Sequence, residues 1–375
     1  MLNMKLFPKT ILVAALSTSM LMVSSLSASE FSDAYKAYKA AVVAKNNTDI
    51  ENYALQAYKL GTQKFAGDSL DLAMLALNAG DASIQNMPAN PYTEENKAKA
   101  DALKEQAFAL YKVALDNYKK EYGADAVELI DPLMGLADSS SKKEAREYLN
   151  DALDIAADSE NPMLLADTQK AYFEMLSNSQ YYTRKVRDYM LDAYQTYQQL
   201  LPENSMKRVL AAYTVGSIEY AEKHYDKAET ALLYVIEQFE ALEFDHPYEL
   251  AAHAKLVELY ERQGESDKST QHCIAIGSMQ PWSPEQEQSP LFRKEPMYPI
   301  SAARAGREGW TIIDFTVDEM GFVVEPVIIE SDGGSRFEKE SLKAIKSWRY
   351  APKFVDGKAT EAKSTVRLDY TLSKY

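Results

Sequence analysis

A helical pattern with a constant period constrains the fold of this chain most. Over residues 30–278, apolar residues recur at spacings of three and four, as on the buried face of an amphipathic helix, and short breakers such as Asn161-Pro162 interrupt them. One apolar motif, with members at offsets 0, +3, +4 and +7, returns every 41 or 42 residues, beginning at Ala145, Val186, Ala228 and Ser269. Such a period is typical of stacked helical hairpins. We expect an all-α solenoid of about twelve helices over residues 30–278.

Two of the predicted hairpins resemble tetratricopeptide repeats. In VGSIEYAEKHYDKA (residues 215–228) a small residue stands at Gly216, an aromatic residue at Tyr225, and Ala228 opens the second helix. Residues 256–269 (LVELYERQGESDKS) form a weaker copy. Arrays of this kind commonly bind peptides or protein surfaces. The residues leave an alternative open, in which the array is a spacer or an oligomerisation platform.

The composition argues against several classes of function. The formal net charge is −15, with −16 on residues 1–289 and +1 on residues 290–375, which argues against a nucleic-acid partner. The single cysteine, Cys273, excludes an internal disulfide and a Cys-based zinc site. It falls with His272 at core-facing positions of the repeat, and no nucleotide-binding or hydrolase motif occurs. We therefore expect a binding or mechanical protein, with no catalytic residues, no cofactor and no metal site.

The N-terminus has the layout of a secretory signal peptide. Lys5 and Lys9 precede an apolar core at residues 11–23, and small residues follow, with Ala28 the expected last residue before cleavage. An uncleaved membrane anchor is the alternative. A helix of 13 residues reaches only ~20 Å of a hydrocarbon core that is ~30 Å thick. We therefore predict a signal peptide over residues 1–28.

The period changes near residue 280. Residues 279–295 are rich in proline and are expected to form a semi-rigid linker. The elements predicted beyond it are strands over residues 311–317, 323–331 and 364–372 and a helix over residues 337–348. The turn at residues 318–321 makes the first two strands an antiparallel hairpin, and Pro326 places the second strand at a sheet edge. The prediction is a small α+β domain with a three-stranded antiparallel sheet and one helix.

Residues 296–375 also carry a series of spaced motifs. These are Tyr298-Pro299, Ala303, Gly309, the strand from Thr311 to Val317, Gly321, the helix from Phe337, Trp348-Arg349-Tyr350, Pro352 and Asp356-Gly357. In their order and spacing they resemble the C-terminal domain of the TonB family of energy transducers. Thr311 departs from the family pattern, which prefers a larger β-branched aliphatic residue there.

The resemblance implies a domain in the periplasm of a Gram-negative bacterium that grips TonB-dependent outer-membrane receptors. Those receptors offer an extended segment, the TonB box, which adds to the last strand of the domain by β-augmentation. The receptor-binding residues implied are Tyr298 and Pro299, which would touch the receptor plug, and Val366, Arg367, Leu368, Asp369, Tyr370, Thr371 and Leu372, which would supply the docking backbone. An alternative for Tyr298 is that it only packs the beginning of the domain.

The chain departs from a complete transducer of this family in two ways. Its N-terminal apolar segment is short and lacks a histidine, and a helical array stands where the family has a long Pro-rich spacer. One hypothesis is a periplasmic protein of TonB-dependent transport, whose array binds another envelope component. A proton-driven inner-membrane motor complex or an anchored adaptor is a candidate partner of the protein, and the partner of the array is left open. The alternative is a scaffold whose TonB-like domain only docks proteins or dimerises, without energy transduction. The oligomeric state is left open.

Overall fold

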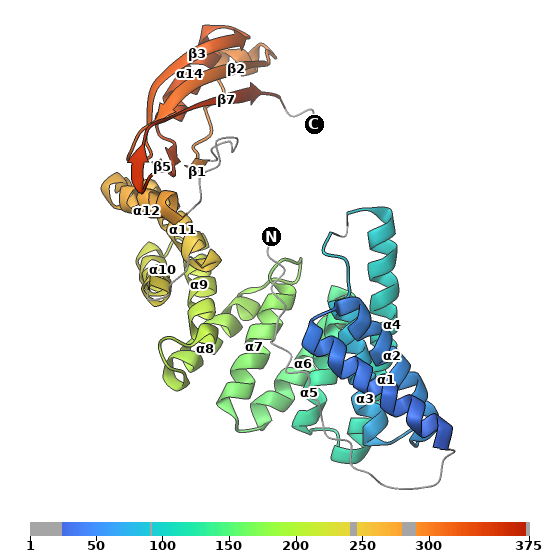
Figure 1. The fold of residues 1–375 in the computed structure, drawn as a ribbon. Coiled ribbons are helices and arrows are strands. Elements are labelled where there is room, and N and C mark those ends of the chain that lie inside the picture. Colours follow the sequence, from blue (N-terminus) through green and yellow to red (C-terminus); the bar gives the residue numbers. More distant parts are fainter. Residues whose placement is uncertain (1–24, 91, 241–245, 280–289, 373–375) are drawn as a thin grey trace. The chain divides into compact units, whose positions relative to one another are not determined.

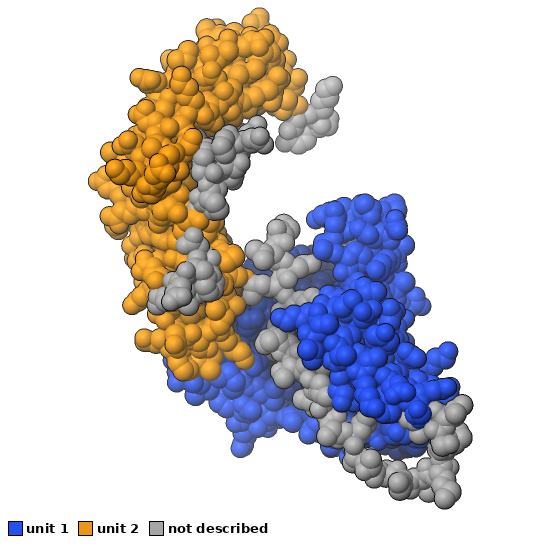
Figure 2. Space-filling view, viewed as in Figure 1, with its two compact units in different colours: residues 1–200 blue, residues 201–375 orange. Residues whose placement is uncertain are grey.

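The computed structural model describes residues 25–90, 92–240, 246–279 and 290–372 of the 375-residue chain. The chain divides into two compact units, Met1–Leu200 and Leu201–Tyr375 (Figure 2). The predicted signal peptide lies outside the described residues, except for its last four residues, which begin the first helix. Among the described helices, none combines the length and the apolarity that crossing a bilayer requires.

The first unit consists of helical hairpins, formed by α1 with α2, α3 with α4, α5 with α6, and α7 with α8 (Figure 1). The helices are α1 (Ser25–Ala44), α2 (Asn47–Lys64), α3 (Leu70–Gln85), α4 (Glu94–Tyr122), α5 (Ile130–Ser139), α6 (Lys142–Asp158), α7 (Pro162–Leu176) and α8 (Arg184–Leu200). Polar caps set where several of them begin. Ser141 and Glu144 form a reciprocal capping box at α6, and the Asn161 side chain accepts hydrogen bonds from two backbone N–H groups at the start of α7.

The second unit continues the helices and ends in the α+β domain. Its helices are α9 (Met206–Ala221), α10 (Tyr225–Glu240), α11 (Pro247–Gln263) and α12 (Ser266–Met279), and α9 pairs with α10 and α11 with α12. The four copies of the repeating motif fall on α6, α8, α10 and α12. Their buried members are Ala145, Leu149, Ala152, Val186, Tyr189, Met190, Ala193, Ala228, Ala231, Leu232, Val235, Ser269, Cys273 and Ile276. The predicted helical-hairpin array is therefore confirmed.

Buried tyrosines connect successive helices of the array. The hydroxyl of Tyr111 on α4 donates to Asp81 on α3, and that of Tyr197 on α8 donates to Asp167 on α7, both over 2.7 Å. Tyr260 on α11 makes the equivalent 2.7 Å bond to Glu229 on α10. These hydroxyls are therefore satisfied by carboxylates inside the protein.

The C-terminal domain is a three-stranded antiparallel sheet in the order β3–β2–β7, with α14 packed on one face (Figure 1). Its elements are α13 (Ile300–Arg304), β2 (Gly309–Val317), β3 (Val323–Asp332), α14 (Ser335–Ile345) and β7 (Ala362–Tyr370). The core contains Ile313, Phe315, Val317, Val323, Ile345, Trp348, Tyr350 and Leu368. This confirms the predicted α+β fold. The helix ends at Ile345, three residues earlier than predicted, because the chain turns there and places Trp348 in the core.

Short strands complete the domain and alter one predicted boundary. β1 (Pro290–Phe292) pairs antiparallel with β4 (Arg349–Tyr350), and β5 (Lys353–Val355) forms a small hairpin with β6 (Lys358–Thr360). The linker predicted over residues 279–295 therefore extends too far toward the C-terminus, because β1 belongs to the folded domain. Its residues 280–289 lie outside the described part of the chain.

Candidate functional site

Strand β7 presents a regular and open edge. Its residues pair one-to-one with β2 from Ala362↔Val317 to Tyr370↔Gly309, without a register shift. On its other side no strand pairs with it among the described residues. In an antiparallel ladder, alternate residues direct their N–H and C=O groups away from the paired strand. β7 therefore offers unpaired backbone groups that can accept an additional strand.

The opposite edge of the sheet, β3, is irregular. Its pairing with β2 shifts register twice, between Ile312 and Ile313 and between Asp314 and Thr316. Pro326 provides no backbone donor, and Glu325 before it has a positive φ of 49°. The sheet-edge position predicted for this strand is confirmed. Bulges and a proline are features that discourage strand addition, so the two edges of this sheet differ in their capacity to pair.

The side chains of β7 alternate between the core and solvent. Leu368 and Tyr370 are 2% and 3% exposed, and Val366 packs against the same core. Arg367 and Asp369 are exposed on the other face. An added strand could therefore contact the predicted residues Val366, Leu368 and Tyr370 only through their backbone, and it could also reach the side chains of Arg367 and Asp369.

The exposed face of β7 is arranged by local polar contacts. The Arg367 guanidinium lies 4.4 Å from the centre of the Trp310 ring, and its Nε donates to Asp369 over 2.9 Å. Of the remaining predicted site residues on this side, Thr371 and Leu372 lie beyond the end of β7. The Leu372 N–H donates to the Glu308 carboxylate over 2.8 Å, which holds the chain beside β2 after the strand ends.

Tyr298 packs beside the C-terminal end of β7. The Tyr298 hydroxyl donates to the Arg307 carbonyl over 2.6 Å, and its ring stands edge-on to Phe337 and Tyr370, with 5.7 Å between ring centres in both cases. Pro299 is the residue that precedes α13. The fold thus brings the two predicted parts of the site together through Tyr298 and Tyr370. This contact also fits the alternative in which Tyr298 packs the beginning of the domain.

A buried hydroxyl network fixes β7 to α14. Thr311 Oγ1 donates to Ser341 Oγ over 2.9 Å, and Ser341 Oγ lies 2.7 Å from the Tyr370 hydroxyl. The Tyr370 hydroxyl also lies 3.1 Å from the Phe337 carbonyl, and burial raises the pKa of Tyr370. Threonine at position 311 therefore has a specific role, because its hydroxyl satisfies the buried Ser341 where an aliphatic residue could not.

Comparisons with known proteins relate this domain to one family. Residues 294–372 match the family described as Gram-negative bacterial TonB protein C-terminal. We call the domain the TonB C-terminal domain after this family. Protein TonB of Vibrio cholerae serotype O1 (strain ATCC 39315 / El Tor Inaba N16961) is 30% identical over 63 residues, which are 17% of this chain and 26% of that protein. The chain thus spans about a quarter of the length of this curated relative.

Solved structures align with each part of the chain. The solution NMR structure of the Pseudomonas aeruginosa TonB CTD is 26% identical, over 24% of this chain and 93% of that one, with a TM-score of 0.22. The TonB2 protein of Vibrio anguillarum is 35% identical, over 25% and 91%, with a TM-score of 0.20. BtubC (BKLC) from P. vanneervenii is 14% identical, over 72% and 100%, with a TM-score of 0.36.

Arg349 links the TonB C-terminal domain to the array, a relationship that sequence reasoning missed. Its side chain is 1% exposed and forms an ion pair with Glu261 on α11. It donates to Ser269 Oγ over 2.6 Å and to Thr270 Oγ1 over 2.8 Å, both on α12. The guanidinium also lies 3.7 Å from the centre of the Phe322 ring. The sequence placed Arg349 in a family motif but gave no signal for partners about 80 residues away.

Two histidines on different helices also meet. His253 on α11 and His272 on α12 lie with their Nδ1 atoms 2.7 Å apart, and the His272 ring stacks on Tyr260. The pKa of each histidine is lowered to about 4, for both by burial and for His253 also by the neighbouring His272. Both imidazoles are therefore neutral near pH 7, and the Nδ1–H group of one donates a hydrogen bond to the Nδ1 atom of the other. The adjacent Cys273 is buried, as its repeat position predicts.

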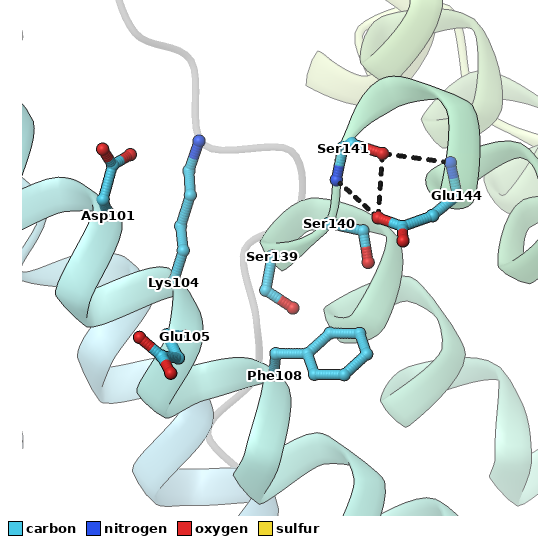
Figure 3. Close-up of a pocket in the computed structure, with 8 residues that line it drawn as sticks. All are labelled: Asp101, Lys104, Glu105, Phe108, Ser139, Ser140, Ser141 and Glu144. Atoms are coloured by element: carbon cyan, nitrogen blue, oxygen red, sulfur yellow. Dashed lines mark hydrogen bonds between the residues drawn. The ribbon is translucent and has the colours of Figure 1, made fainter.

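In the first unit, a hollow of about 470 Å³ opens between α4 and the loop joining α5 to α6 (Figure 3). Its lining is Asp101, Lys104, Glu105, Phe108, Ser139, Ser140, Ser141 and Glu144. The lining contains three carboxylates and one ammonium group, so its formal charge is negative. One of those carboxylates, Glu144, is already engaged with Ser141 in the capping box.

Proposed function

We propose that this protein binds the TonB boxes of outer-membrane receptors by β-augmentation on β7 and acts in TonB-dependent transport. The observation that carries the proposal is the contrast between the two edges of the sheet. β7 has a ladder of nine pairs without a shift and a second side on which no strand of the described residues pairs, whereas β3 is interrupted by two bulges and by Pro326. A peptide strand added to β7 would gain main-chain hydrogen bonds along a regular template.

The proposed location is the periplasm of a Gram-negative bacterium. The TonB C-terminal domain supports an envelope role, and the sequence of residues 1–28 supports export through a signal peptide. An uncleaved N-terminal segment that anchors the chain in the inner membrane is the alternative. The proposed role is binding and mechanical rather than catalytic.

The helical array is proposed to contact a second envelope component, either a proton-driven inner-membrane motor complex or an anchored adaptor. Its stacked hairpins provide extended surfaces of the kind that bind proteins. Its charge, −16 over residues 1–289, favours a partner segment that carries basic residues.

The decisive experiment is a titration of the full chain with a TonB-box peptide, followed by NMR or calorimetry. A matched peptide of the same sequence, with alternate backbone amides N-methylated, keeps the side chains and loses the donors that β-augmentation uses. We expect the first peptide to bind and the second to lose binding. Absence of binding up to ~1 mM peptide, or equal binding of both peptides, would overturn the proposal.

The same hypothesis can be tested by changing the backbone of β7 instead of the peptide. Arg367→Pro removes one amide donor from β7, while Arg367→Ala removes the same side chain and keeps the amide. We expect Arg367→Pro to weaken peptide binding strongly and Arg367→Ala to weaken it little. Circular dichroism of each variant checks that the domain remains folded.

A second candidate function follows from the same edge. The open side of β7 could pair with another copy of the domain, which would make the protein a scaffold that docks or dimerises without energy transduction. Sedimentation velocity distinguishes the two functions. A dimer that TonB-box peptide does not dissociate favours the scaffold, and a monomer that binds the peptide favours the receptor-binding role.

A further inference from the structure

The TonB C-terminal domain contacts the array through an apolar surface. Leu291 and Phe292 of β1 pack, together with Ala351, against the buried cluster Val257, Cys273 and Ile276 of α11 and α12. Farther along α12, Gly277 lies so close to the β5–β6 hairpin that an added Cβ would come within 3.0 Å of the Phe354 ring. The last hairpin of the array therefore shares a packed core with the domain that follows it.

A buried charge lies beside this apolar contact. Besides its contacts with Glu261, Ser269 and Thr270, Arg349 donates to the Ser266 carbonyl over 3.3 Å and to the Met320 carbonyl over 3.0 Å. The acceptors belong to α11, to α12 and to the β2–β3 turn, so one guanidinium bonds both parts. Separating the parts would leave two charges without their partners, and the planar fork of arginine fixes the directions of its bonds.

The neighbours of Arg349 in sequence reach the core beneath β7. Trp348 and Tyr350 flank it, and both belong to the buried cluster that contains Leu368 of β7. The Tyr350 N–H donates to the Gly321 carbonyl over 2.9 Å, which ties β4 to the same β2–β3 turn. A continuous set of packed side chains thus runs from Glu261 on α11 to Leu368 on β7.

We infer that α11, α12 and the TonB C-terminal domain form one rigid module, with Arg349 as the positioning residue that fixes the orientation of the β7 edge relative to α11 and α12. A domain on a flexible tether would instead sample many orientations. If the proposed function holds, a pull on a strand added to β7 reaches α11 and α12 through packed side chains as well as along the backbone. This consequence rests on the proposed function, whereas the rigidity of the module does not.

The test measures distances between spin labels in the full chain. Gln271→Cys on α12 and Lys339→Cys on α14 provide two exposed labelling sites, one on each part. The natural Cys273 is buried, and burial raises the pKa of its thiol to about 12, so it stays unlabelled; the chain without introduced cysteines checks this. Pulsed electron–electron double resonance then gives the distribution of distances between the two spin labels. A single narrow distribution is expected, and a broad one would overturn the inference.

The role of Arg349 is tested in the same labelled chain. Arg349→Met keeps much of the volume and removes the charge and the donors, and we expect the distance distribution to at least double in width. Arg367→Met is the matched control, because Arg367 is exposed and its ion pair with Asp369 lies within its own domain, and it should leave the distribution unchanged. A folded Arg349→Met chain with an unchanged narrow distribution would refute the role of Arg349.

A second variant covers the case in which Arg349→Met fails to fold. Glu261→Gln keeps the shape and a hydrogen-bond acceptor but removes the charge that balances Arg349, and it should broaden the distribution to a smaller extent. An unchanged distance distribution in this variant would show that the Arg349–Glu261 ion pair does not fix the orientation of the domain. None of these measurements uses a peptide. Loss of peptide binding with a narrow distribution would therefore reject the proposed function and leave the rigid module intact.

Discussion

Arg349 on β4 and Glu261 on α11 form a buried ion pair across 88 residues of sequence. Their side chains are 1% and 9% exposed, so water screens neither charge well. A pair of this kind adds little net stability compared with apolar residues, but removal of one partner leaves an uncompensated buried charge. The stability of the TonB C-terminal domain should therefore depend on a residue of the array.

Arg349→Ala should lower the free energy of unfolding of the second unit by ~3–5 kcal/mol, because it leaves the Glu261 carboxylate buried and unpaired. Urea unfolding followed by tryptophan fluorescence measures this, since all three tryptophans lie between residues 282 and 348. Arg367→Ala, at an exposed pair, should change the value by less than ~1 kcal/mol. Equal effects of the two substitutions would contradict the prediction.

The His253–His272 pair should make the stability of the helices pH-dependent. The folded-state pKa of each histidine is lowered to about 4, below the ~6.5 of an unfolded chain, so the unfolded state binds more protons between these values. The free energy of unfolding should then fall as the pH drops below ~6.5 and remain level above ~7.

Urea midpoints from far-UV circular dichroism at about pH 7.5 and about pH 5.5 measure this effect. His272→Gln serves as the comparison, because it removes one of the two titrating groups and the lowering of the His253 pKa by its neighbour. The variant should show a smaller difference between the two midpoints. An identical difference in both proteins would show that other groups cause the pH dependence.

The hydroxyl network under β7 predicts a graded pair of effects. Tyr370→Phe removes the group that contacts both Ser341 and the Phe337 carbonyl, and it should cost ~1–2 kcal/mol. Thr311→Val removes only one donor to Ser341 and should cost less. Tyr122→Phe, at a hydroxyl on an exposed side chain of α4, should stay within ~0.5 kcal/mol of the unmodified protein. Chemical unfolding of the variants gives these values, and the reverse order would refute the network.

Gly321 should tolerate no side chain. Its φ is +84°, and an added Cβ would collide with the Tyr350 carbonyl oxygen where the β2–β3 turn meets β4. Gly264, which ends α11 with a φ of +80°, has open space around the same position. Gly264→Ala should cost ~1 kcal/mol for the backbone conformation alone, whereas Gly321→Ala should cost clearly more. Thermal unfolding of the two variants compares their stabilities directly. Similar losses of stability would show that the β2–β3 turn can move to accommodate the added Cβ.

Periodic features of the chain could be predicted from sequence, and isolated long-range contacts could not. The apolar motif that begins at Ala145 recurs on α6, α8, α10 and α12, because each of these helices must bury the same face. The alternation of Leu368 and Tyr370 with Arg367 and Asp369 revealed which face of β7 is buried, because side chains of a strand point to opposite faces.

By contrast, a single contact leaves no repeating trace in the sequence. In the sequence, Arg349 and Glu261 cannot be distinguished from charged residues at the surface, because only the fold places them in contact. His253 and His272 lie on different helices, and no spacing in the sequence relates them. β1 was missed for a related reason. Its three residues lie in a Pro-rich stretch, and such a short strand forms only because β4 is available beside it.

The irregular β3 edge limits how many molecules can join through this sheet. A sheet with two regular open edges can recruit a neighbour on each side, and the neighbours can recruit others, which leads to fibres. Here the turn of the backbone at Glu325 and the missing amide of Pro326 end that series on one side. This sheet can therefore engage one added strand at a time, and association through its edges would produce pairs rather than polymers.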